Sequence, residues 1–220
     1  MQSKRITLFA GHYGSGKTNI AVNYALYLKS LGKSVVIADL DIVNPYFRTR
    51  DSINELTQAG VRLISSEFAS SNVDLPALPQ DVYSILDNHG QSAIMDIGGD
   101  DRGAYALGRY ADSIKDENDY EMLFVFNKFR PLTPTAEEAL EIMREIEVAC
   151  KINFTAIVNN SNLGELTTPQ DVLSSVSETQ RLSEISGLPV KMTAVRSDLV
   201  NNLNGKVENL FPLTLQNKIV

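Results

Sequence analysis

The chain has 220 residues, 43% of them hydrophobic, which is enough for one substantial core and short enough for a single domain over residues 1–220. Its net charge of −7 and pI near 4.9 disfavour broad binding to nucleic acids or to anionic membranes. The single cysteine, Cys150, excludes an intrachain disulfide and a C-x-x-C metal site. No apolar run approaches the roughly 18 residues that span a bilayer, so we expect a cytoplasmic protein.

Short apolar runs alternate with helical patterns from the N-terminus onward, and the first run is better explained as a strand than as a signal peptide. Runs such as V-V-I-A and L-F-V-F lack polar alternation, which is typical of strands covered on both faces in a parallel sheet. The expected strands are Ile6–Ala10, Ser34–Ala38, Val61–Ile64, Ser92–Ile97, Glu121–Phe126, Phe154–Val158 and Pro189–Ala194.

Helical spacing of apolar residues fills the intervals between these strands. The expected helices are Lys17–Leu31, Phe47–Ala59, Pro79–Asn88, Pro134–Cys150 and Pro169–Ser186. Thr133 is the predicted N-cap of the fourth helix, and the serine- and proline-containing stretch 65–79 is expected to be a surface loop. The alternation predicts an α/β fold with a doubly wound, mainly parallel sheet of about seven strands and helices on both faces.

A glycine-rich loop follows the first strand directly. Residues 11–18 read G-H-Y-G-S-G-K-T and satisfy the P-loop pattern G-x-x-x-x-G-K-[ST]. Glycines let successive backbone N–H groups point at phosphate oxygens, Lys17 is expected to reach the β- and γ-phosphates, and the Thr18 hydroxyl is expected to coordinate Mg²⁺. The candidate nucleotide-binding residues here are Gly11, Gly14, Ser15, Gly16, Lys17, Thr18 and Asn19.

Carboxylates follow two strands whose carboxyl ends should lie at the same edge of the sheet as the P-loop. Asp39 and Asp41 come directly after V-V-I-A, and Asp96 closes S-A-I-M before Gly98 and Gly99. The two glycines are candidates for a switch that responds to the γ-phosphate, whereas a capping role for Asp39 is the alternative. The expected metal ligands are Thr18, Asp39 and Asp96.

Together, four segments resemble MinD/ParA-type P-loop ATPases. These belong to the wider SIMIBI class, which also holds signal-recognition GTPases, nitrogenase iron protein and dethiobiotin synthetase. The segments are the N-terminal P-loop, V-V-I-A-D-L-D, M-D-I-G-G and T-A-I-V-N-N, and they span most of the chain. The resemblance implies a protein that binds ATP and Mg²⁺.

The resemblance also implies roles for residues outside the P-loop. Asp41 matches the residue that orients the attacking water, which makes it a candidate catalytic residue together with Lys17. Asn159 matches the asparagine that hydrogen-bonds adenine, with Asn160 as a close alternative and an ordinary strand-end turn as the plain interpretation. Arg48 lies in the region that forms a nucleotide-responsive switch in these relatives, or is a solvated arginine at a helix entry.

Position 12 departs from the pattern. Many relatives carry a second lysine early in the loop, in the form G-K-G-G-x-G-K-T, which reaches across a dimer to the partner's nucleotide. His12 occupies that position here and Tyr13 follows it. A neutral histidine donates one hydrogen bond but brings no permanent charge, so a homodimer, if formed, is not expected to be lysine-driven.

Adenine is favoured over guanine by the segment after the fifth strand. Asn127-Lys128-Phe129-Arg130 begins like the guanine-binding N-K-x-D, but Arg130 stands in place of the aspartate, and a cation cannot accept the N–H groups of guanine. Arg130 is instead expected at the site rim, on a partner surface or at the start of the next loop.

The leading hypothesis is an ATP-binding switch or regulatory ATPase that hydrolyses slowly without a protein partner. One alternative is a small-molecule kinase- or ligase-like enzyme of the dethiobiotin-synthetase type. A metallochaperone or cofactor-maturation ATPase is the second, weakened by the absence of C-x-x-C. The C-terminal tail contains Pro212 and little basic charge, unlike a membrane anchor, and no basic region indicates nucleic acid.

Overall fold

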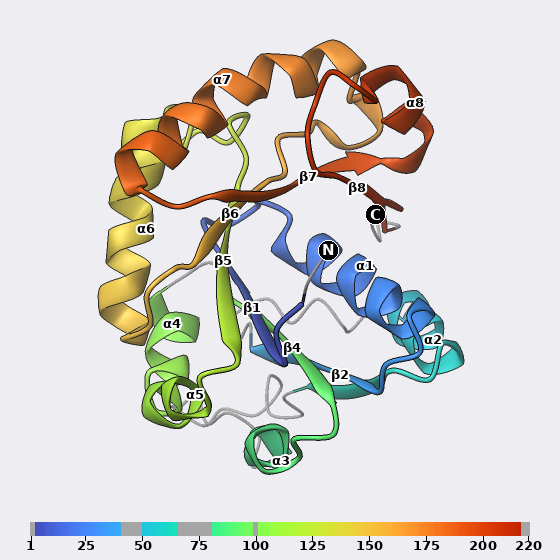
Figure 1. Cartoon of the computed structure of the whole chain (residues 1–220), viewed down its shortest axis with the longest axis vertical. Helices are drawn as coiled ribbons and strands as arrows, with labels where there is room; N and C mark the ends of the chain where they lie inside the picture. Colours follow the sequence, from blue (N-terminus) through green and yellow to red (C-terminus); the bar gives the residue numbers. More distant parts are fainter. Residues whose placement is uncertain (1–2, 41–49, 66–80, 99–100, 217–220) are drawn as a thin grey trace.

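β1 (Ile6–Ala10) lies inside an eight-stranded sheet in the computed structural model, which describes residues 3–40, 50–65, 81–98 and 101–216 (Figure 1). The strand order is β3-β2-β4-β1-β5-β6-β7-β8, and each neighbouring pair is parallel. The predicted parallel α/β fold is therefore confirmed, with one strand more than expected. In such a sheet the strands' carboxyl ends form one edge, and the P-loop leaves from that edge.

The remaining strands are β2 (Val35–Leu40), β3 (Arg62–Ser65), β4 (Ser92–Ile97), β5 (Tyr120–Phe126), β6 (Ala156–Asn159), β7 (Val190–Arg196) and β8 (Leu210–Leu213). The helices are α1 (Lys17–Ser30), α2 (Arg50–Gln58), α3 (Asp81–Asp87), α4 (Asp101–Leu107), α5 (Ala111–Glu117), α6 (Ala136–Cys150), α7 (Pro169–Ser186) and α8 (Val200–Leu203).

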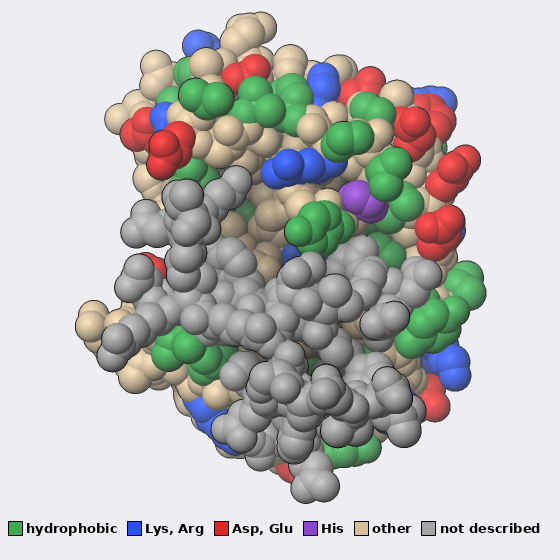
Figure 2. Space-filling model, turned by 180° about the vertical axis from the view of Figure 1, so that it is seen from behind, with side chains coloured by type: hydrophobic (Ala, Val, Ile, Leu, Met, Phe, Trp, Pro, Cys, Tyr) green, Lys and Arg blue, Asp and Glu red, His purple; other side chains and the backbone are tan. Residues whose placement is uncertain are grey.

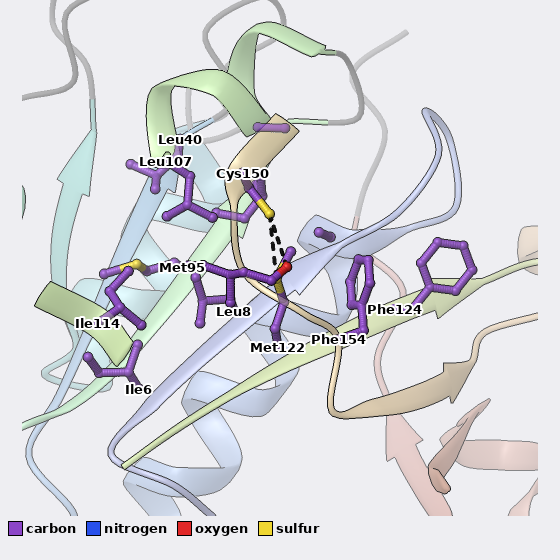
Figure 3. Packing of buried hydrophobic residues seen from close by; sticks show 14 of the residues in the cluster. Ile6, Leu8, Leu40, Met95, Leu107, Ile114, Met122, Phe124, Cys150 and Phe154 are labelled. Carbon is purple, nitrogen blue, oxygen red and sulfur yellow. Dashed lines mark hydrogen bonds between the residues drawn. The ribbon is translucent and has the colours of Figure 1, made fainter. Parts of the chain in front are cut away.

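Alternate residues of the buried strands enter two separate hydrophobic clusters, one on each face of the sheet. Ile6 and Leu8 of β1 join a cluster that also holds residues of α3, α4, α5 and α6, whereas Phe9 joins one that holds residues of α1 and α2. Figure 3 shows part of the first cluster, with Leu8 of β1 among side chains from neighbouring strands and helices. Successive side chains of a strand point to opposite faces of the sheet, and both faces are covered, so the strand sequences are apolar throughout.

Cys150 at the end of α6 is buried and belongs to the first cluster (Figure 3). Its Sγ atom lies 3.4 Å from the carbonyl oxygen of Ile152, to which the thiol donates, and burial raises the pKa of the thiol. Among the described helices, none is both long and apolar enough to cross a membrane.

The predicted cap of the fourth helix was wrong. Thr135, not Thr133, precedes α6, and its side chain accepts a hydrogen bond from the backbone N–H of Glu138, whose carboxylate accepts from Thr135 N in return. Buried Thr133 donates to the carbonyl oxygen of Asn127 instead. The T-x-x-E spacing of this capping box decides where the helix begins.

Four of these helices and strands were absent from the sequence prediction: α4, α5, α8 and β8. The predicted helices over 47–59 and 79–88 and the loop over 65–79 fall partly on residues 41–49 and 66–80, outside the described residues. The other predicted strands and helices are found within three residues of the expected ends.

Candidate functional site

The P-loop, residues 11–18, connects β1 to α1 and depends on glycine at two positions. Gly11 has φ +152°, and a Cβ atom there would lie 2.6 Å from the carbonyl oxygen of Val125, the penultimate residue of β5. Gly16 has φ +88° in the left-handed region and starts α1. Ser15 N donates to His12 O at 3.1 Å, which closes the loop between these glycines.

Lys17 and Thr18 occupy the first turn of α1. Lys17 is only 6% exposed, and its Nζ donates to the carbonyl oxygen of His12 at 3.2 Å, so the ammonium group lies over the loop. Thr18 Oγ1 donates to Oδ2 of Asp96 at 2.5 Å. The N-terminus of α1 contributes further N–H groups and the positive end of its dipole to this site.

Asp39 and Asp96 lie side by side. They are register partners on the adjacent strands β2 and β4, and both are buried. With the Thr18 hydroxyl they form a set of oxygen donors, which is the type that Mg²⁺ takes, and Mg²⁺ completes its shell with water and phosphate oxygens. Among the described residues, no group of three His, Cys, Asp or Glu side chains is arranged to hold a metal ion.

The predicted switch residues are only partly described. Gly98 directly follows β4 and is buried, and a Cβ atom on Gly103 of α4 would lie 2.9 Å from Gly98 N. The backbone after Asp96 therefore passes in close contact with α4. Asp41, Arg48 and Gly99 lie outside the described residues.

Asn19, a predicted nucleotide-binding residue, bonds to the C-terminal part of the chain. Its Nδ2 donates to the carbonyl oxygen of Thr214, just beyond β8, at 3.2 Å. Asn23, one turn later in α1, donates to the same oxygen at 3.0 Å and accepts from Thr214 N at 2.8 Å. These contacts attach α1 to the end of β8, as their proximity in Figure 1 also indicates.

The two asparagines at the end of β6 differ in their contacts. Asn159 Nδ2 donates to Ser175 Oγ of α7 at 2.8 Å, so this side chain joins β6 to α7. Asn160 Nδ2 donates to the carbonyl oxygen of Ser15 at 2.7 Å and would lie 2.4 Å from a Cβ atom on Gly16. Asn160 is therefore the member of this pair that contacts the P-loop.

The sequence left three places open for Arg130, and the structure puts it beside the P-loop, in agreement with the first of them, the rim of the site. The Arg130 guanidinium lies 3.6–3.8 Å from the position of a Cβ atom on Gly14, whereas Lys128 Nζ donates to Ser174 O of α7. The signal available in the sequence was indirect: if β5 is the neighbour of β1, the loop after β5 must meet the P-loop. Figure 2 shows basic, histidine and hydrophobic side chains together on the face seen from behind, beside the surface that is not described.

Beyond Asn160, a small pocket lies at the carboxyl ends of β6, β7 and β8. Asparagine, threonine, arginine and aliphatic residues line it. Its lining residues are Asn160, Asn162, Gly164, Thr167, Val172, Ala194, Val195, Arg196, Leu213 and Leu215, with no carboxylate side chain among them. Asn160 thus joins this pocket to the P-loop.

The fold is similar to solved structures of FtsY. Cell division protein FtsY from Thermotoga maritima has a TM-score of 0.60 and 23% identity over 86% of this chain. Chloroplast FtsY from Physcomitrella patens has a TM-score of 0.58 and 15% identity over 88% of this chain. The signal recognition particle receptor FtsY from Elizabethkingia anophelis has a TM-score of 0.51 and 18% identity over 88% of this chain. The chain spans 58–61% of the length of these three structures.

A comparison with curated proteins found no match to the chain. The family described as the CobQ/CobB/MinD/ParA nucleotide binding domain matches residues 6–187, which include the P-loop, both buried aspartates and the asparagines after β6. A match over most of the chain, on a parallel sheet with a P-loop after β1, identifies the family. The chain belongs to the CobQ/CobB/MinD/ParA nucleotide-binding domain family.

Proposed function

We propose that this protein binds ATP with Mg²⁺ and hydrolyses it as a nucleotide-dependent switch or regulator. The observation that carries the proposal is the contact between the P-loop and β4: Thr18 Oγ1 donates to Asp96 Oδ2 at 2.5 Å, and Asp39 lies beside Asp96 in the register. A hydroxyl on the first turn of α1 next to two buried carboxylates suits a metal that also contacts a bound phosphate.

Each residue then has a definite task. The backbone N–H groups of residues 12–16 and the start of α1 hold the phosphates, and Lys17 neutralises part of their charge. Thr18, Asp39 and Asp96 would hold Mg²⁺, which neutralises further phosphate charge when it is bound. Asp41 is proposed to orient the attacking water. Gly98 and Gly99, with Arg48, are proposed to respond to loss of the γ-phosphate.

The pocket after β6 supports adenine as the base. Guanine presents two N–H donors on its Watson–Crick edge and is matched by a carboxylate, whereas adenine presents one donor and one acceptor and is matched by an amide. Asn160 and Asn162 are among the lining residues and no Asp or Glu is; in the structure their amides bond to each other and to the backbone of Ser15 and Gly164. Asn160 is the better candidate than Asn159 for a residue near the nucleotide, because it bonds to Ser15 O of the P-loop.

Binding and hydrolysis of Mg²⁺-ATP by the wild type, Lys17→Ala and Asp96→Asn test the site. Loss of a hydrogen bond to a charged group costs about 1.5–3 kcal/mol, so Lys17→Ala should weaken ATP binding by roughly tenfold or more. Asp96→Asn should reduce the dependence of binding on added Mg²⁺. Equal ATP affinity in Lys17→Ala and the wild type would refute the site.

Base preference is tested separately with Asn162→Asp. The wild type should prefer ATP to GTP, and the introduced carboxylate should move the ratio of the two dissociation constants toward GTP. The matched control is Asn88→Asp, an equivalent change on the surface near the amino ends of the strands, which should leave the ratio unchanged. A wild type that binds GTP more tightly than ATP would overturn the adenine assignment and leave the phosphate site standing.

A further inference from the structure

The loop after β5 meets the P-loop at two points. Gly11 lies against the backbone of Val125 in β5, so closely that only glycine fits there. Arg130 lies against Gly14 at the apex of the P-loop, with its Nε, Cζ and Cδ atoms 3.6, 3.7 and 3.8 Å from the Cβ position of that glycine. The Arg130 side chain therefore lies next to the space that a side chain on Gly14 would occupy, beside the loop that is suited to phosphate.

The backbone of this loop is held from several sides. Arg130 N donates to Asn127 O at 3.1 Å, and Arg130 O accepts from Thr133 N at 3.1 Å. Asn127 Oδ1 accepts from Phe129 N at 3.0 Å. Both peptide groups of Arg130 are thus fixed, so the position of its Cα relative to Gly14 is set by the fold rather than by a long flexible connection.

The guanidinium itself lacks the partners that would explain a structural role. In the described part of the chain, Arg130 Nε is buried and has no hydrogen-bond acceptor, and Arg130 forms no ion pair with a described residue. A buried N–H without an acceptor is costly, and a guanidinium gains most from two parallel bonds to a carboxylate or a phosphate. The anion for which the adjacent loop is suited is phosphate.

The other cation of the same turn behaves differently. Lys128 Nζ donates to Ser174 O of α7 at 2.8 Å and is directed away from the P-loop. His12 brings no permanent positive charge to the loop. Lys17 is thus the cation that the P-loop itself supplies, and Arg130 is a second cation delivered to the same place by a neighbouring strand.

We propose that Arg130 is a phosphate-binding residue, the second cation of the nucleotide site, supplied in cis by the loop after β5. The inference rests on the proposed function, because it assigns a residue to the same site. It follows that charge on the β- and γ-phosphates is compensated within one chain, so Arg130 should act equally in dilute and concentrated protein.

The test compares Arg130→Gln with Lys128→Gln, which removes the same charge from the same turn. Affinities are measured for ATP, ADP and AMP with Mg²⁺, after thermal unfolding has established that each variant folds. Arg130→Gln should weaken ATP binding about 10- to 100-fold and leave AMP binding within about twofold, because AMP lacks the β- and γ-phosphates. Lys128→Gln should leave all three affinities near those of the wild type.

Arg130→Lys keeps the charge but loses the planar fork, so its loss of ATP affinity should be smaller than that of Arg130→Gln. If Arg130→Gln does not fold, Arg130→Lys tests the proposal instead, by the same comparison of the losses of affinity for ATP and for AMP. An unchanged ATP affinity, or equal losses for AMP and ATP, would overturn the proposal, the second outcome assigning Arg130 to packing alone. If Lys17→Ala also binds ATP normally, the proposed function fails; if only the arginine variants do, the site stands and this inference fails.

Discussion

Gly16→Ala should destabilise the protein through a specific collision with Asn160. The added methyl would sit 2.4 Å from Asn160 Nδ2, inside van der Waals contact, on a residue whose φ of +88° is already unfavourable for an L-amino acid. The left-handed conformation alone costs about 1–2 kcal/mol. Displacing Asn160 adds the loss of its 2.7 Å hydrogen bond to Ser15 O, about 1 kcal/mol, and about 1 kcal/mol or more of overpacking.

A double-mutant cycle separates these contributions. In the wild-type background Gly16→Ala should lower the free energy of unfolding in urea by about 3–4 kcal/mol, but by only about 1–2 kcal/mol in the Asn160→Ala background, where the collision is absent. Gly32→Ala is the matched control: its φ of +81° is similar and no atom lies within 4 Å of the Cβ position, so it should show the conformational cost alone. Additive costs for Gly16→Ala and Asn160→Ala would refute the reasoning.

Three further predictions concern the scaffold. Thr168→Ala should lower the free energy of unfolding by about 1 kcal/mol at pH 7, because Thr168 and Asp171 form the capping box of α7. Hydrogen bonds from Thr168 lower the pKa of Asp171, so this stabilisation is present above about pH 4 and is lost as the pH falls through the folded-state pKa. Equal losses of stability in urea at pH 7 and pH 3 would contradict this prediction. Lys191→Met should cost about 3 kcal/mol in urea unfolding, because it leaves the buried Glu121 carboxylate without its cation, and adding Glu121→Gln should recover most of that cost. Cys150 should resist a thiol reagent at pH 8 until the protein unfolds, because burial raises the pKa of its thiol; labelling at the unfolded rate in native buffer would contradict its buried position.

The parallel sheet and the P-loop could be predicted because their signals are local. Apolar runs, a glycine pattern between a strand and a helix, and acidic residues at strand ends all lie within a few positions of each other. The adjacency of Asp39 and Asp96 depends on β2 pairing with β4, which is a long-range event. Strand order is set by packing of both faces, so the sequence could place these carboxylates at one edge but not beside each other.

Two of the missed elements, β8 and α4, show a conflict between local propensity and tertiary packing. β8 contains Pro212, which argues against a central strand, but β8 is the edge of the sheet, where a missing N–H is tolerated. α4 contains Gly103, a weak helix former, yet a side chain there would collide with Gly98. The residue that hides the element in the sequence is thus tolerated by its surroundings in β8 and required by a close neighbour in α4.

The comparison of Asn127–Arg130 with a guanine motif named residue types but not their place in the sheet. A linear motif identifies residue types, but the strand that carries them decides which part of a ligand they can meet. β5 pairs with β1, so the loop after β5 reaches the P-loop and delivers Arg130 to its apex, whereas β6 lies one strand further out and carries Asn160 and the pocket beyond it.

On the proposed function, the sheet order also divides the work around β1. β2 and β4, on one side, carry the two aspartates of the metal site, and β5 and β6, on the other, carry the second cation and the amides next to the base. A nucleotide lying along the strand ends would then have its terminal phosphates toward β4 and its base toward β6. This orientation places Arg130 between Asn160 and the metal ligands, which is why its loss should weaken binding of ATP but not of AMP.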